Sequence, residues 1–225
     1  MAGEKINLEY ITEYLHTLFP PKDALLEELE TYAKEYDVPI IHPEVRALLQ
    51  FLCKLSKPSR VLEVGTAIGY SAIVFAKELP RDGRLITVER EPDMTALALE
   101  NVEKAGLRDI IRIIEGEALE VLSCLNSKFD LIFIDAAKGY YHEFFELVLP
   151  LLNDGGIIVS DNVLYKGMTA SDDLVKRRQK TIVGRMRDYL EMLCEHPKLT
   201  TSVLPVGDGV ALSFYSEKGK TNETT

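Results

Sequence analysis

Five short apolar runs, separated by segments of helical character, constrain the fold of this chain more than any other feature. The runs show little polar alternation, as is typical of strands that are buried on both faces of a parallel sheet. Strand–helix alternation at this spacing predicts βαβ units and a doubly wound α/β sheet. The predicted strands cover residues 60–64, 84–89, 110–115, 131–134 and 156–160, with helices over 70–79, 93–105, 118–125 and 141–152.

The segments on either side of this alternating region complete the predicted fold. Residues 1–56 are expected to form a helical cap, because apolar residues recur there at helical spacing. After the fifth strand we predict a long charged helix over 172–195 and two apolar strands over 200–206 and 209–215. The Gly-Asp-Gly link between these strands predicts an antiparallel hairpin at the edge of the sheet, which gives a mostly parallel, seven-stranded, Rossmann-like sheet. The polar tail over 216–225 is expected to be flexible.

Length, charge and cysteine content limit the classes of protein to which the chain can belong. Its 225 residues suit one domain over 1–225. The formal net charge of -10 argues against non-specific coating of nucleic acid, which depends on Lys and Arg neutralising phosphates. The three scattered cysteines favour thiols in a reducing compartment over disulfides or a zinc site. With no apolar run near the ~18 residues of a membrane span and no secretory signal, we expect a cytoplasmic protein without membrane attachment.

Polar residues close every strand of the predicted parallel sheet. In sheets of this type, ligands bind beyond the carboxyl ends of the strands. The closing residues, in strand order, are Glu63, Glu89, the run from Glu115 to Ala118, Asp135, and the run from Ser160 to Asn162. A single acid at such a position is more often a helix cap than a functional group. Polar closure of all five strands instead favours a binding or catalytic site.

The loop after the first strand, GTAIG, indicates the kind of ligand. A dinucleotide-binding loop has the pattern GxGxxG, whose central glycine lets the backbone approach a pyrophosphate. Here Ala67 occupies that central position, between Gly65 and Gly69. The loop therefore suits a smaller nucleoside ligand without phosphates. Glu89 is placed to bind ribose hydroxyls, although the same acid also occurs in NAD-binding proteins.

Three oxygen-bearing side chains on adjacent strand ends predict a metal site. Asp135 follows the fourth strand, and Asp161 and Asn162 follow the fifth. Two carboxylates and one amide match the oxygen coordination that Mg²⁺ prefers, and the absence of a Cys or His at these strand ends makes zinc a poor candidate. Lys138 lies at the edge of the same site and could act as a general base if the cation lowers its pKa. The alternative for Lys138 is an ordinary solvated lysine.

Five segments together resemble the metal-dependent, catechol-type O-methyltransferases that use S-adenosylmethionine. They are VLEVGTAIGYS, the VER after the second strand, FDLIFIDAAKGYY, GGIIVSDNVLYKG and the final PVGDGVALS, and they span nearly the whole chain. Within this family the chain looks closest to the bacterial branch that methylates 5-hydroxyuridine at the wobble position of tRNA. That narrower resemblance rests on YAKEYDVPI, DNVLYKG and the basic run LVKRRQKTIVGRMRDYL with the EHP and PVGDG that follow.

The resemblance implies a role for each residue of the site. The amino-acid end of S-adenosylmethionine would be held by Glu63, Gly65 and Ser71, with Ile41 packed nearby. Glu89 would bind the ribose, and Gly116, Glu117 and Ala118 would frame the adenine, although the family often has Asp in place of Glu117. Asp135, Asp161 and Asn162 would bind Mg²⁺, and Asp135 would also approach the amino group of the cofactor. Lys138 matches the catalytic lysine of the family.

The metal residues alone do not select the substrate. Catechol offers two adjacent hydroxyls, and 5-hydroxyuridine offers its 5-hydroxyl beside the 4-carbonyl, so one chelating metal could serve either. The basic run between Lys166 and Arg187 favours the anticodon loop of a tRNA, with Lys166, Arg177, Arg178 and Lys180 as contacts to phosphates. A solvated helix face is the alternative for this run.

Our leading hypothesis from the sequence is therefore a tRNA 5-hydroxyuridine O-methyltransferase. A small-molecule catechol O-methyltransferase is second, and a non-catalytic RNA- or S-adenosylmethionine-binding module is third. Tyr140, Tyr141 and Tyr165 are candidates for stacking on RNA bases, with ordinary packing as the alternative. The family resemblance and the apolar N-terminal helices also suggest a homodimer.

Overall fold

The computed structural model describes residues 6–219, which group into two compact units. The N-terminal unit is Leu8–Cys124, and the C-terminal unit consists of residues 125–219 together with Ile6 and Asn7. The first five residues of the expected helical cap and residues 220–225 of the expected flexible tail lie outside the described part. Within that part, Ser216 N donates to Lys198 O at 2.9 Å.

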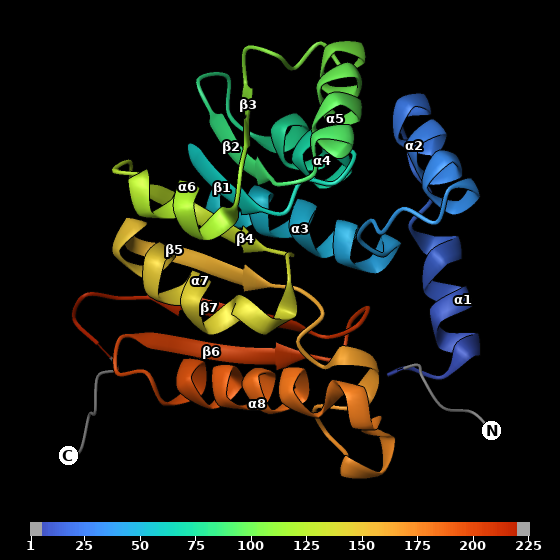
Figure 1. The fold of residues 1–225 in the computed structure, drawn as a ribbon. Helices are drawn as coiled ribbons and strands as arrows, with labels where there is room; N and C mark the ends of the chain where they lie inside the picture. Colours follow the sequence, from blue (N-terminus) through green and yellow to red (C-terminus); the bar gives the residue numbers. More distant parts are fainter. Residues whose placement is uncertain (1–5, 220–225) are drawn as a thin grey trace. The chain divides into compact units, whose positions relative to one another are not determined.

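The N-terminal unit begins with three helices, as the apolar spacing predicts. These are α1 (Glu9–Leu18), α2 (Ala24–Glu35) and α3 (Pro43–Ser56), which Figure 1 shows in blue. Asp23 caps α2, because its carboxylate accepts the N–H groups of Leu25 and Leu26. Pro43 occupies the first turn of α3, where a missing N–H costs no hydrogen bond.

Three parallel strands follow, each connected to the next through a helix. In chain order the elements are β1 (Arg60–Val64), α4 (Tyr70–Glu78), β2 (Arg84–Glu89), α5 (Pro92–Lys104), β3 (Ile111–Glu115) and α6 (Ala118–Cys124). Val64 pairs with Val88, and Glu89 pairs with Glu115, so the carboxyl ends of these strands are in register. The polar residues that close the strands therefore lie along one edge of this unit.

The C-terminal unit holds the other four strands. Its main elements are β4 (Phe129–Ile134), α7 (Tyr141–Val148), β5 (Leu152–Ser160), α8 (Lys180–Glu195), β6 (Leu199–Leu204) and β7 (Val210–Tyr215). β4 and β5 are parallel, whereas β7 runs antiparallel to both β5 and β6. The strand order of the seven-stranded sheet is β3-β2-β1-β4-β5-β7-β6. The predicted fold class, a mostly parallel sheet with a C-terminal antiparallel pair, is confirmed.

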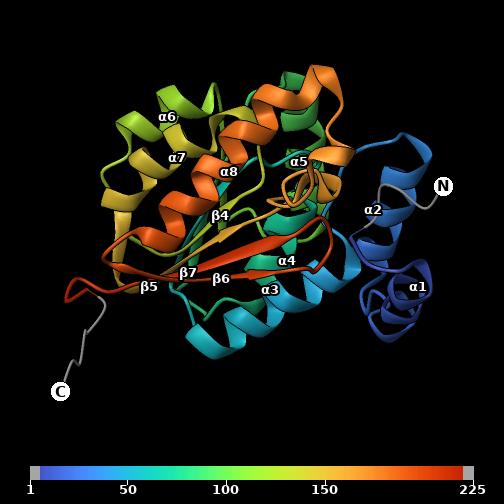
Figure 2. The same cartoon turned by 90° about the horizontal axis from the view of Figure 1, so that it is seen from below.

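Helices α7 and α8 pack against each other in the C-terminal unit, and α8 runs along β6 (Figure 2). The residues from Leu131 to Ile134 of β4 are fully buried, as expected for a strand that is covered on both faces. Among residues 6–219, no helix is long and apolar enough to cross a membrane.

Two predicted helix boundaries in this unit are wrong. The helix predicted to end at residue 152 ends at Val148, because Pro150 has no N–H to continue it, and β5 already begins at Leu152. The long helix predicted from residue 172 begins only at Lys180. Arg187, on that helix, donates to Asp172 at 2.7 Å and to Thr169 O at 2.9 Å. These side-chain bonds help to hold residues 172–179 as two short 3₁₀ turns instead of a helix.

A buried polar network joins the helices of the N-terminal unit. The guanidinium of Arg46 on α3 is almost fully buried and donates to Glu30 of α2 at 2.5 Å and to the Tyr70 hydroxyl of α4 at 2.8 Å. It also donates to Phe19 O, in the link between α1 and α2. Loss of the cation would leave the half-buried Glu30 carboxylate with the Tyr70 hydroxyl as donor but without a positive charge beside it, which is costly.

We predict that Arg46→Ala lowers the free energy of unfolding by roughly 3–5 kcal/mol, because it breaks a buried ion pair and leaves one charge behind. Guanidinium unfolding followed by circular dichroism measures this change. Arg108→Ala is the matched control, since Arg108 forms an exposed pair with Glu103 at 3.3 Å and should cost less than about 1 kcal/mol. Equal losses for the two variants would contradict the structural role of Arg46.

Candidate active site

The ends of β4 and β5 place two acids next to each other. Ile134 and Ser160 are paired in the parallel register, and each is followed by an aspartate. The N–H of Asp161 donates to the carbonyl of Ile134 at 2.9 Å, which extends the pairing by one residue. Asp135 and Asp161 therefore leave the sheet at the same edge, as the sequence predicts.

The carboxylate of Asp161 is in an environment that disfavours its own charge. The residue is only 1% exposed, and Oδ1 accepts the N–H of Asn162 at 2.7 Å. Oδ2 is buried and has no hydrogen-bond partner among the described residues. Burial, and next the negative charge of Asp135, raises the pKa of Asp161 well above its usual range. A cation bound at this edge would pair with Oδ2 and offset the repulsion between the two acids.

Asn162, the third predicted oxygen donor, has an unusual backbone conformation. Its φ is +56°, in the left-handed region that Asn adopts more easily than most residues. The turn is fixed by Val163 N and Leu164 N, which donate to the carbonyls of Gly209 and Asp208 at 2.9 and 3.0 Å. Gly209 has a φ of +90°, and a Cβ there would lie 2.4 Å from Leu164 Cγ, so only glycine fits.

Asp208 lies close enough to affect Asp161 electrostatically, and the sequence reasoning gave it no role at the site. The hairpin link was interpreted only as a turn, but the structure brings Asp208 to the loop that follows Asp161. Its carboxylate accepts the N–H of Lys166 at 2.5 Å. Its negative charge is also a further cause of the raised pKa of Asp161. The Gly-Asp-Gly pattern was the available signal, because an acid between two glycines is not needed for a hairpin.

Tyr141 fixes the geometry of the two strand ends. Its hydroxyl donates to Asp161 O at 2.9 Å and lies 3.3 Å from Ile134 O, the carbonyl just before Asp135. It therefore contacts both strand ends that carry Asp135, Asp161 and Asn162, which we call the acidic edge. The residue is 1% exposed, and its ring packs edge-on against Tyr189 with centroids 5.4 Å apart. The suggestion that Tyr141 stacks on an RNA base is therefore wrong; its ring is packed in the interior and its hydroxyl bonds to the two strand ends. Tyr140, by contrast, is exposed.

Lys138 lies one short turn beyond Asp135. It begins the 3₁₀ turn η1 (Lys138–Tyr140), which leads into α7, and it is half-buried. Its positive charge lowers the pKa of Asp161, against the larger effect of burial. The structure thus places an amine within electrostatic reach of the acidic edge. The acids, the amide and the amine of this edge all belong to the C-terminal unit.

In the N-terminal unit, Glu89 organises the glycine-rich loop between β1 and α4. Its Oε2 accepts the N–H groups of Ala67 at 2.8 Å and Thr66 at 3.2 Å. Its Oε1 accepts the N–H groups of Arg90 and Glu91 at 2.9 and 3.0 Å. A carboxylate offers about four acceptor positions, so a ribose hydroxyl would share oxygens that already hold the loop. The sequence reasoning missed this contribution to loop structure.

The other predicted cofactor residues lie around the same strand ends. Glu63 is fully buried on β1, and Ser71 is buried in the first turn of α4. Gly116 N donates to Glu89 O at 2.8 Å, which connects the loop after β3 to the end of β2. Ala118 begins α6, directly after Glu117, and Ile41 is buried just before α3. Their contacts with a cofactor stay predictions.

The basic segment between Lys166 and Arg187 divides into two groups. Arg185 donates to Gly139 O at 2.6 Å, and Arg187 holds the loop that precedes α8, so these two have structural partners. Arg177, Arg178 and Lys180 are exposed. The arginines lie in the 3₁₀ turn before α8 instead of on a continuous helix. A continuous basic helix face, as the sequence suggested, is therefore not present in this segment.

Comparison with known proteins identifies the family. The family model described as O-methyltransferase matches residues 20–215. The catechol O-methyltransferase of Niastella koreensis is 36% identical over 217 residues, covering 92% of this chain and 96% of that protein. A caffeoyl-CoA O-methyltransferase of Populus kitakamiensis is 31% identical, covering 91% and 92%. The structure of an O-methyltransferase from Bacillus cereus in complex with SAH (S-adenosylhomocysteine) superimposes with a TM-score of 0.81 at 28% identity, covering 92% and 97%. The chain therefore belongs to the S-adenosylmethionine-dependent O-methyltransferase family.

Proposed function

We propose that the protein transfers the methyl group of S-adenosylmethionine to one hydroxyl of a substrate with two adjacent oxygens. A divalent cation would be held by Asp135, Asp161 and Asn162. The observation that carries this proposal is the buried Oδ2 of Asp161, which lacks a hydrogen-bond partner among the described residues. The negative charge of Asp135 also acts on this carboxylate and raises its pKa. The all-oxygen donor set is the one that Mg²⁺ and similar cations prefer.

The residues of the acidic edge then have distinct tasks. When bound, a divalent cation supplies Lewis-acid polarisation, which lowers the pKa of a hydroxyl beside it. Asp161 and Asn162 present their oxygens from a turn that the hairpin loop holds, and Tyr141 fixes the carbonyls behind them. Lys138 Nζ, in its neutral form, would accept the proton of the substrate hydroxyl. The freed oxygen forms the new O–C bond as the S–C bond of the sulfonium breaks, in an in-line displacement.

The proposed contacts of the methyl donor come from residues of the N-terminal unit and from Asp135. Glu63, Gly65 and Ser71 would hold its amino-acid end beside Ile41, and Glu89 its ribose. Gly116, Glu117 and Ala118 would frame the adenine, and Asp135 would contact the amino group. The positive φ values of Gly65, Ala67 and Gly69 support this assignment, because they show a tightly turned loop, and its two glycines carry no side chain that would keep a ligand from the backbone.

We infer that small catechol-like molecules are the first candidates for the substrate. The relative from Niastella koreensis named catechol O-methyltransferase covers nearly the whole chain at 36% identity, which supports this choice. The 5-hydroxyuridine of a tRNA anticodon loop is the second candidate. It is favoured by one observation, the exposed cations Arg177, Arg178 and Lys180 next to each other in the chain. Lys166 would add a fourth contact.

A homodimer is part of the proposal. Helix α1 exposes Tyr10, Tyr14 and Leu18 and has no buried residue, so its apolar side chains are available to a second copy.

Replacement of the central acid tests the cation site. We predict that Asp161→Asn lowers methyl transfer about 100-fold or more, because an amide oxygen carries no negative charge to compensate that of the cation, while the affinity for S-adenosylmethionine changes less than about threefold. Calorimetric titration of the cofactor and of Mn²⁺, beside an activity assay, measures these effects. Wild-type protein that keeps full activity after exhaustive treatment with EDTA would contradict the chelation mechanism.

Removal of a single hydroxyl tests the positioning role of Tyr141. We expect Tyr141→Phe to weaken Mn²⁺ binding about 10–100-fold, as outer-shell changes at metal sites commonly do, without loss of the fold. Tyr140→Phe, at an exposed neighbouring position, is the matched control and should bind like wild type. Unchanged Mn²⁺ affinity in Tyr141→Phe would show that the hydroxyl does not organise the strand ends.

Parallel assays with two substrates decide between the candidates. The leading choice predicts methylation of a catechol by the purified protein, and the same rate when Arg177 and Arg178 are both changed to Glu. If tRNA containing 5-hydroxyuridine is the substrate, the double variant should lose tRNA methylation, because the added acids repel phosphates. Methylation of tRNA with no detectable reaction on catechols would overturn the leading choice.

A further inference from the structure

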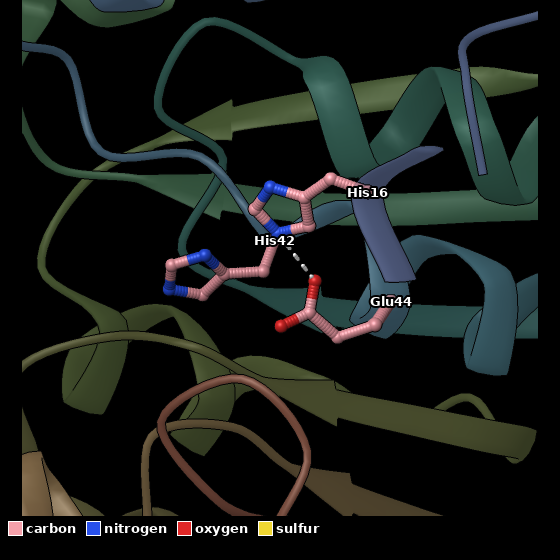
Figure 3. Close-up of side chains that lie close together, drawn as sticks. All are labelled: His16, His42 and Glu44. Carbon is pink, nitrogen blue, oxygen red and sulfur yellow. Dashed lines mark hydrogen bonds and ion pairs between the residues drawn. The ribbon is translucent and has the colours of Figure 1, made fainter. Parts of the chain in front are cut away.

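Two histidines and a glutamate, none of them among the residues assigned to methyl transfer, meet in the N-terminal unit (Figure 3). His16 lies in the last turn of α1, His42 occupies the N-cap position of α3, and Glu44 lies in the first turn of α3. One nitrogen or oxygen atom from each side chain lies within 4.8 Å of the others. The three side chains therefore gather where two helix ends meet.

Glu44 is the buried member of this cluster. It is 6% exposed, and its Oε2 lies 2.9 Å from Nε2 of His16, as the dashed line in Figure 3 marks. A carboxylate is rarely buried without a cation or a set of donors beside it. The His16 side chain is 39% exposed, so the cluster is buried on the side of Glu44 and open on the side of the histidines.

His42 is available to a ligand. It is exposed, and its side chain makes no capping hydrogen bond, although it occupies a position where Ser, Thr, Asp or Asn would normally cap the helix. As a helix cap, His42 therefore stabilises α3 less than Ser, Thr, Asp or Asn would. Its ring lies close to the hydrogen-bonded pair of His16 and Glu44. One ion could therefore contact both imidazoles and the carboxylate.

We propose that His16, His42 and Glu44 form a second metal site for a zinc-type transition-metal ion. Imidazole nitrogens favour Zn²⁺, Co²⁺ or Ni²⁺ over Mg²⁺, which prefers oxygen ligands. Ligand atoms of a tetrahedral zinc ion lie about 2.0–2.2 Å from it and hence about 3.3–3.6 Å apart. The ligand atoms of the cluster, which lie within 4.8 Å of one another, would have to approach by roughly 1 Å to reach that spacing, and the exposure of His42 leaves room for its ring to move. Water would fill the remaining coordination positions.

A bound ion would attach α1 to the unit. Helix α1 has no buried residue, so few apolar contacts hold it. An ion that joins His16 of α1 to His42 and Glu44 of α3 would restrain its last turn. The site thus differs from the acidic edge in its donor atoms, in the metal it selects and in the effect of the metal on the chain.

Zinc titration of the full chain by calorimetry tests the site. The background variant is Asp161→Asn, with excess Mg²⁺ present, so that the acidic edge does not compete. We expect one Zn²⁺ per chain, and His42→Gln should weaken its binding at least tenfold. His42 is exposed, so this change should not disturb folding. His142→Gln is the matched control, because His142 pairs with Glu146 at 3.9 Å on α7 and should leave the affinity unchanged.

Hydrogen exchange over residues 9–18 provides the second measurement. Zinc should slow exchange near His16 in the background protein but not in His42→Gln. Equal zinc affinity in His42→Gln and in the background protein, or equal slowing of exchange in both, would overturn the proposal. Failure of the background protein to bind zinc would overturn it as well.

Discussion

The repulsion between two acids at the ends of neighbouring strands is the constraint on which the candidate site depends. Parallel pairing of β4 and β5 forces Asp135 and Asp161 to leave the sheet together, and the burial of Asp161 removes much of the water that would otherwise screen its charge from that of half-buried Asp135. A site of this kind destabilises the chain unless a cation or a proton compensates the charge. Three neighbouring residues shape the environment of these charges. Tyr141 holds the backbone carbonyls, Asn162 adopts a left-handed turn, and Lys138 contributes positive charge.

The glycine-rich loop of the N-terminal unit follows a different physical rule. Its shape depends on backbone N–H groups that converge on one carboxylate, that of Glu89. A buried or half-buried acid is stable when it accepts several such bonds, because each N–H replaces a lost water. The loop is therefore preformed, which reduces the entropy that a nucleoside ligand would have to overcome on binding.

Much of this arrangement could be predicted because it depends on local patterns. Apolar runs give the strands, and parallel strands bring their closing residues to one edge, so Asp135, Asp161 and Asn162 could be grouped from the sequence alone. The rest depends on contacts between distant residues. Tyr141 reaches the carbonyl of Asp161 across 20 positions, and Arg187 bonds to Asp172 and so shortens the predicted helix. The meeting of His16 with Glu44, which depends on how two helices pack, has no signal in the local sequence.

The central claim is that a divalent cation compensates the charges of buried Asp161 and half-buried Asp135 at the ends of β4 and β5. Anomalous diffraction from crystals grown with Mn²⁺ and S-adenosylhomocysteine tests it most directly. The account predicts one strong peak within about 2.0–2.4 Å of oxygens from Asp135, Asp161 and Asn162. Absence of a peak there, with the two carboxylates sharing a proton in a short hydrogen bond, would contradict the account.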